Sequence, residues 1–217
     1  MKKGFIYLLL SLLAIFIISA CAPDTTETPD AIEEEAPVEV TEEAADEIGL
    51  PDAEVFQIVV DGIIGEGEYP NSYQDSATGL TLFWHNDQEN LYIGLKSDHE
   101  GWSAIGFDPE QAMQGANIIL VAMDGEDPLI RDDFGDGMFS HKPDQELGGT
   151  TDILSYAGQK HDSGYSFEFA IPLDSGDEFD KKLESGQEYD IILAVHASSI
   201  DFDVKHTSIS SASIALD

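Results

Sequence analysis

The sequence predicts an all-β protein, an immunoglobulin-like antiparallel β-sandwich preceded by a signal peptide and a disordered acidic linker. Three observations lead to this prediction. From residue 55 onward, apolar residues alternate or form short runs bounded by Gly, Asn and Asp, which is the pattern of strands between turns. No segment of this part carries a convincing helical stripe. The residues before 55 form an apolar leader and an acidic stretch, neither of which can join a globular core.

Residues 1–20 have the layout of a secretory signal peptide. Lys2 and Lys3 precede two apolar runs, and the segment closes on the small residues Ser19 and Ala20. The apolar stretch is shorter than the roughly 20 residues that a membrane-spanning helix needs. We therefore expect this segment to be cleaved, the alternative being a retained anchor helix.

The stretch Ile18-Ser19-Ala20-Cys21 resembles the lipobox of bacterial lipoproteins. The resemblance implies that Cys21 carries a lipid, which would anchor the protein to the outer face of a membrane in the cell envelope. The chain has one cysteine, so it can form no intramolecular disulfide and no thiolate cluster for zinc or an iron–sulfur centre.

Residues 21–54 begin at the lipidated cysteine and have the composition of a disordered acidic linker. They mix Pro and Thr with a long acidic series and contain no Lys or Arg. Such a stretch has too little apolar surface to offset chain entropy, and its charges repel one another. We expect a tether, the alternative being a segment that docks on a basic partner.

The formal net charge of the whole chain is −35. This charge argues against nucleic acid as a partner, because phosphate binding needs clustered Lys and Arg. Cationic partners, divalent metals and a saline habitat all remain compatible with it.

The globular part, residues 55–217, contains short apolar segments at regular intervals, separated by turn residues. This spacing favours two packed antiparallel sheets. The expected strands are 55–60, 80–84, 91–97, 104–107, 118–123, 129–131, 153–157, 166–171, 191–197 and 207–214.

Two of these strands predict their own surroundings. In 91–96 apolar residues alternate with Tyr92, Gly94 and Lys96, so one face is expected in the core. The segment 118–123 is apolar at every position, which favours a central strand with its outer face covered. Such a strand serves either as plain core or as the floor of a ligand pocket.

The stretch Gly-Trp-Ser-Ala-Ile-Gly-Phe at 101–107, followed by Met113-Gln-Gly-Ala, resembles the DOMON domain. That module occurs in dopamine β-monooxygenase-like proteins and in secreted cytochromes that bind haem. Weaker matches continue through 130–134 and 167–180 to Lys205-His206-Thr207, so the resemblance covers roughly 61–214. Two positions depart from the family pattern, namely Ile171 and His196.

The resemblance implies a b-type haem held between Met113 and His206. A thioether and an imidazole leave no open coordination position, which favours electron transfer to a redox partner protein. The Cys-x-x-Cys-His motif that attaches c-type haem is absent. The alternatives are an apolar plug for Met113 and an ordinary exposed side chain for His206. His196 is either a rival ligand or a core histidine.

A second hypothesis is a binding module for carbohydrate or another small ligand without redox chemistry. In this interpretation Trp102, Trp84 and Tyr92 line the ligand pocket and stack on a sugar ring. The sequence has no Gly-x-Ser-x-Gly elbow, no His-Glu-x-x-His and no phosphate loop, so we expect a binding or electron-transfer module rather than an enzyme.

A third hypothesis is a bound calcium ion. Asp132, Asp133 and Asp136 lie in the stretch Asp-Asp-Phe-Gly-Asp-Gly and offer clustered hard oxygen donors, although their spacing is not that of an EF-hand. The alternative is a solvated acidic turn.

Overall fold

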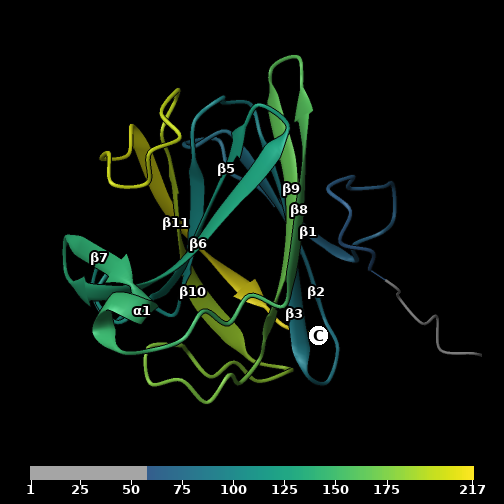
Figure 1. Cartoon of the computed structure of the whole chain (residues 1–217). Coiled ribbons are helices and arrows are strands. Elements are labelled where there is room, and N and C mark those ends of the chain that lie inside the picture. The colour runs from purple at the N-terminus through teal and green to yellow at the C-terminus, as the bar shows by residue number, and fades with distance from the viewer. Residues whose placement is uncertain (1–57) are drawn as a thin grey trace, which may run out of the picture. The chain divides into compact units, whose positions relative to one another are not determined.

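The computed structural model describes residues 58–217, which form eleven strands and one short helix. The strands make two antiparallel sheets that pack face to face (Figure 1). The predicted all-β sandwich is therefore confirmed. The expected signal peptide 1–20, the lipidated Cys21 and the linker 21–54 lie outside the described residues. Within 58–217, no helix is both long and apolar enough to cross a membrane.

One sheet has five strands in the order β1-β2-β3-β9-β8, and each neighbouring pair is antiparallel. Strand β2 of this sheet alternates between buried and half-buried positions, as expected for a strand with one face in the core. The bounds are Asn71–Gln74 (β1), Leu80–Asn86 (β2), Asn90–Ser97 (β3), Ser155–His161 (β8) and Gly164–Pro172 (β9).

The second sheet has six strands in the order β11-β10-β4-β5-β6-β7. Strand β5 lies between β4 and β6, so the predicted central place of 118–123 is confirmed. The bounds are Ser103–Phe107 (β4), Asn117–Asp124 (β5), Asp127–Gly137 (β6), Ser140–Pro143 (β7), Glu188–Val195 (β10) and Ser208–Ala215 (β11), and the helix α1 spans Asp144–Leu147.

The main core lies between the sheets and is built from the inward-facing residues of both. Phe167 and Phe169 of β9 face this core together with Ile105 of β4, and all three are fully buried. A buried hydrogen bond also joins the sheets, since the Tyr165 hydroxyl donates to the Ser103 Oγ at 2.8 Å. Removal of this apolar surface from water is the main stabilising contribution to the fold.

The first predicted strand, 55–60, is wrong over its described residues, because 58–60 form no strand. A buried carboxylate holds the segment that follows. Glu168 of β9 accepts hydrogen bonds from the backbone N–H groups of Asp61 (3.1 Å) and Gly62 (2.8 Å). Gly62 has a φ of +87°, and a Cβ there would come within 2.8 Å of the Gly158 backbone. The chain turns at this glycine and covers the outer face of the five-stranded sheet.

Three elements have no counterpart among the predictions, namely β1, β7 and α1. Strands β1 and β7 are polar edge strands, so they lack the apolar alternation from which strands are predicted. Strand β6 is also longer than the predicted 129–131, because its polar second half pairs with β7.

Candidate functional site

The six-stranded sheet carries a second apolar layer on its outer face. Every residue of β4 is buried, as are all but the last of β5, so both faces of these strands are covered. Outside the main core, Ile118 and Leu120 pack with Trp102 and several alanines in a separate cluster. An apolar outer face that loops cover is a suitable place for a ligand cavity.

A cavity lies over this layer and consists of two hollows of about 160 and 530 Å³. The hollows share a set of lining residues, so we treat them as one cavity. The floor includes the small residues Ala104, Gly106 and Ala194, which leave room above the sheet. The shared lining residues are Trp102, Met113, Phe139, His141, His206 and Ile209.

The lining residues above the floor come from connections that are far apart in the chain. Met113 lies between β4 and β5, His141 lies on β7, and His206 lies between β10 and β11. Met113 and His206 line both hollows. The structure therefore brings together the two residues that the sequence pairs as haem ligands.

The Met113 loop rests directly on β6. The Gly135 N–H donates to the Ala116 carbonyl at 2.9 Å, and the Gly115 N–H donates back to the Gly135 carbonyl at 2.8 Å. A Cβ on Gly135 would overlap the Met113 carbonyl oxygen. Only glycine at position 135 lets the loop approach this closely, so β6 determines where Met113 sits.

His206 is partly buried at the edge of the cavity. Burial, helped by the positive charge of Lys205 and by His141, lowers the pKa of His206 below its ordinary value. The imidazole is therefore neutral at pH 7, which is the form that coordinates a metal. The backbone N–H of the next residue, Thr207, donates to the Val195 carbonyl at 2.8 Å and fixes the chain here.

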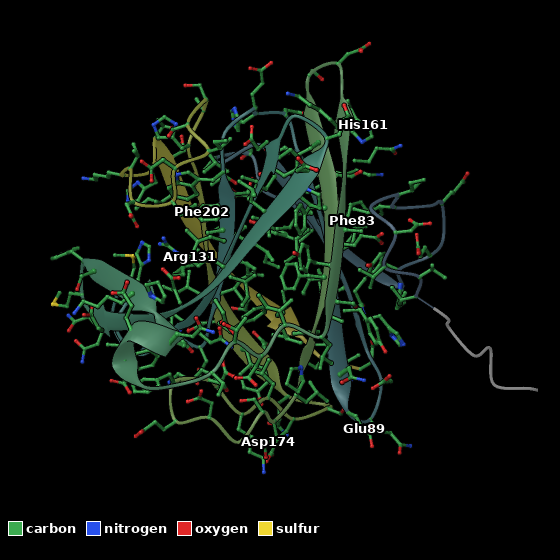
Figure 2. All side chains as sticks on the ribbon, viewed as in Figure 1. Phe83, Glu89, Arg131, His161, Asp174 and Phe202 are labelled. Carbon is green, nitrogen blue, oxygen red and sulfur yellow. The ribbon has the colours of Figure 1, made fainter. Side chains whose placement is uncertain are left out.

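A buried ion-pair network supports another wall of the cavity. The Asp133 carboxylate is fully buried and accepts two bonds from Arg131, at 2.7 and 2.9 Å. Its Oδ2 also lies 2.5 Å from the His141 Nδ1, which orients that ring. The Arg131 guanidinium stacks over the Phe202 ring at 5.3 Å, as Figure 2 allows the reader to follow.

The three aromatic residues predicted for the ligand pocket are not brought together. Trp102 lines the cavity, is 3% exposed and donates from Nε1 to the Val204 carbonyl. Trp84 instead belongs to the main core, where its Nε1 donates to the Ala215 carbonyl. Tyr92 lies on the five-stranded sheet, and its hydroxyl donates to Asp87.

The rival ligand His196 does not line the cavity. Its Nδ1 accepts hydrogen bonds from the backbone N–H groups of Ser198 (3.1 Å) and Ser199 (2.8 Å). This nitrogen is therefore occupied in shaping the loop after β10.

The three carboxylates predicted to bind calcium are likewise not brought together. Asp133 pairs with Arg131 and His141, as described above. Asp136 accepts a bond from Ser140 and pairs with Lys142. Successive strand residues point to opposite faces, which separates Asp132 from Asp133. Residues 58–217 contain one group of acidic side chains close enough together to hold a metal ion, namely Asp132, Asp152 and Asp180. Of the three predicted residues, only Asp132 belongs to it.

Sequence reasoning missed several residues of these sites. His141 and Phe139 reach the cavity from the β6–β7 hairpin, where strand β7 lacks the apolar alternation from which strands are predicted. Asp152 and Asp180 lie in connections and are far from Asp132 in the chain. In so acidic a sequence, no pattern singles out these two carboxylates.

Comparisons with known proteins give one family and several solved structures. A family model described as the DOMON domain matches residues 76–196. No curated protein matches the sequence.

Among solved structures, the fold is similar to the cytochrome domain of Myriococcum thermophilum cellobiose dehydrogenase, with a TM-score of 0.49, 11% identity and coverage of 68% of this chain and 88% of that one. It is also similar to the cytochrome b domain of Coprinopsis cinerea pyranose dehydrogenase, with a TM-score of 0.44, 12% identity and coverage of 67% of this chain and 87% of that one.

A third similar structure is a family 9 carbohydrate binding module from Caldicellulosiruptor kristjanssonii in complex with glucose. Its TM-score is 0.45 and its identity 15%, and the match covers 74% of this chain and 92% of that one.

Proposed function

Because this chain belongs to the DOMON domain family, whose model matches more than half of it, we propose that the sandwich binds haem b and passes electrons to a partner protein. One observation carries the proposal. Met113 and His206, which the family resemblance pairs as ligands, come from distant connections and line the same cavity.

The residues around the cavity fit such a group. A thioether and a neutral imidazole are both chemically suitable ligands for haem iron, and a haem held by Met113 and His206 would take up and release single electrons. The small residues Ala104, Gly106 and Ala194 keep the floor low, so a flat ligand can lie on the sheet. The larger hollow, about 530 Å³, falls within the range of about 300–1,000 Å³ that is usual for ligand pockets.

The rim of the cavity offers a place for the partner. Met138, Phe139, Val204 and Ile209 are large apolar side chains that are exposed around it, and Phe139 is 84% exposed. Exposed apolar residues gathered in one place are typical of interaction sites. We propose that a redox partner contacts this rim. We further propose that a lipid on Cys21 and the acidic linker hold the domain at the outer face of a membrane, where it meets this partner.

Absorption spectroscopy tests the haem proposal. The purified full chain, supplied with haem b, should bind it in a one-to-one ratio and show the spectrum of a haem with two axial ligands, both oxidised and reduced. Met113→Ala and His206→Ala should each change that spectrum, because each removes one ligand. His196→Ala should leave the ligand set unchanged, and His161→Ala is a control outside the cavity. A colourless protein that takes up no added haem would rule the proposal out.

The second candidate function is carbohydrate binding, and the residues that support it line the larger hollow. There Trp102, Phe139 and Phe202 lie beside the charged side chains of Asp203 and Lys205. Aromatic rings next to hydrogen-bonding groups also suit a sugar. Binding of a glycan by the haem-free chain, lost in Trp102→Ala, would favour this function. Uptake of haem without any glycan binding would remove it.

A further inference from the structure

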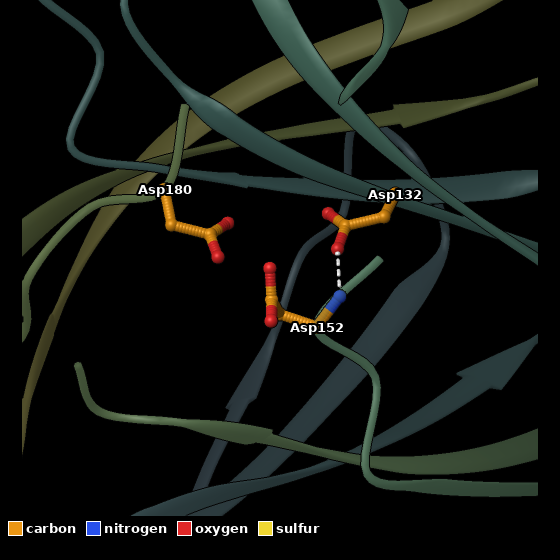
Figure 3. Close-up of side chains that lie close together, drawn as sticks. All are labelled: Asp132, Asp152 and Asp180. Atoms are coloured by element: carbon orange, nitrogen blue, oxygen red, sulfur yellow. Dashed lines mark hydrogen bonds between the residues drawn. The ribbon is translucent and has the colours of Figure 1, made fainter. Parts of the chain in front are cut away.

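Three carboxylates from separate parts of the chain converge at one point of the sandwich. Asp132 lies on β6, Asp152 precedes β8, and Asp180 lies between β9 and β10. One oxygen from each lies within 4.8 Å of the others, and the three side chains point toward one another (Figure 3). The Asp152 backbone N–H donates to the Asp132 Oδ2 at 2.8 Å.

Buried oxygen atoms without partners lie at this point. Asp132 is 3% exposed and its Oδ1 accepts no hydrogen bond. Asn117 is 5% exposed; its Nδ2 donates to the Asp180 Oδ1 at 2.6 Å, while its own Oδ1 has no partner. Asp144 is fully buried with both oxygens unpartnered. Buried polar atoms are almost always paired, so this concentration of acceptors calls for a missing donor or cation.

No basic side chain in residues 58–217 supplies that charge. None of the ion pairs there involves Asp132, Asp152 or Asp180, and the adjacent Lys181 pairs with Asp108. The carboxylates of Asp132, Asp152 and Asp180 therefore have no cationic side chain to compensate them when they are ionised, and a bound cation would supply that compensation.

We propose that Asp132, Asp152 and Asp180 bind one calcium ion, with the Asn117 amide oxygen and water as further ligands. Calcium takes six to eight oxygen ligands in flexible geometry, whereas magnesium demands a near-ideal octahedron and gives up water reluctantly. None of these four residues lines the cavity, so the calcium site is separate from the cavity proposed for haem.

The ion would join the two sheets. Asp132 belongs to the six-stranded sheet, Asp152 leads into β8 of the five-stranded sheet, and Asp180 lies on the connection between the sheets. One cation bound by all three would therefore clamp one end of the sandwich. Binding to the folded state alone also raises its stability.

Calcium binding by the full chain, freed of metals with a chelator, tests the proposal. Equilibrium dialysis should show one saturable site above the weak background that the acidic surface binds. The midpoint of thermal unfolding should rise as this site fills. Asp132→Asn and Asp180→Asn should each weaken the site at least 10-fold. Asp136→Asn, a carboxylate on the same strand but outside the group, is the matched control and should leave it unchanged.

Loss of folding cannot mimic this result. Asp132→Asn removes a buried charge, so without calcium the variant should unfold at a temperature no lower than the wild type, yet calcium should no longer raise that temperature. The proposal is overturned if no saturable site is found, or if Asp136→Asn weakens binding as much as the other two variants. It is also overturned if magnesium at equal concentration raises the midpoint equally, since that result indicates general screening of the acidic surface.

Discussion

Replacing Gly135 with alanine should displace Met113 from a bound haem while the sandwich stays folded. Gly135 lies on β6 against the backbone of the Met113 loop, and a new Cβ there would sit 2.6 Å from the Met113 carbonyl carbon. Ordinary contacts of a Cβ begin at 3.4 Å, so the carbonyl must retreat by at least 0.8 Å. Metal–ligand bonds tolerate deviations of only about 0.2 Å. The thioether should therefore lose its bond to iron.

The expected spectrum of the Gly135→Ala variant is that of Met113→Ala, because both lose the sulfur ligand and keep His206. Haem affinity should fall by about 10- to 100-fold, as is usual when a residue that positions a ligand is changed. Titration with haem b, followed by absorption, measures both effects. Gly65→Ala is the control, since its Cβ would meet only the Glu68 side chain, at 3.3 Å from Oε2 and 3.8 Å from Cβ.

Wild-type haem affinity and spectrum in Gly135→Ala would contradict this prediction. A spectrum like that of His206→Ala would contradict it as well, because Gly135 lies against the methionine loop. Circular dichroism and thermal unfolding of the haem-free variant check that the sheets remain intact.

Three further predictions concern stability. Tyr165→Phe removes the bond to Ser103 between the sheets and should cost about 1 kcal/mol, measured as a lower urea midpoint; an unchanged midpoint would contradict it. Glu168→Ala leaves the Tyr69 hydroxyl and two backbone donors without an acceptor, so it should cost about 3 kcal/mol and expose residues 58–70 to proteolysis; equal protection would argue against this role. Asp144 has a pKa of about 8 in the folded state against 3.8 as its ordinary value, so unfolding releases a proton between these values. With chelator present, the thermal midpoint should therefore fall as the pH rises from 5 to 8, and a rise would refute it.

The strands that were predicted correctly are those whose burial can be inferred from the pattern of apolar residues along the strand itself. The outward and inward residues of β2 alternate along the strand, and β5 is apolar throughout because it is covered on both faces. The polar edge strands β1 and β7 were not predicted, because they form by hydrogen bonding to one neighbouring strand and carry no apolar pattern. The segment 58–60 was misread because a distant carboxylate, Glu168, determines the path of the chain that follows it.

The candidate sites divide in the same way. Met113 and His206 could be named from motifs, because each lies in a stretch that resembles a known family. The faces on which Trp84 and Tyr92 lie depend on sheet order and register, which no local stretch contains. Trp84 therefore proved to be part of the main core and Tyr92 a hydrogen-bond partner of Asp87, and both lie on the five-stranded sheet.

The sequence by itself determined the class of fold and, through its resemblance to the DOMON domain, proposed Met113 and His206 as haem ligands, because alternation and motifs are local properties of the chain. Only the tertiary structure decided that Met113 and His206 share one cavity. It alone also placed Asp152 and Asp180, instead of Asp133 and Asp136, beside Asp132. The physical reason is the same in both cases: ligands to one ion or one cofactor meet across sheets and connections, and their convergence depends on how the two sheets pack.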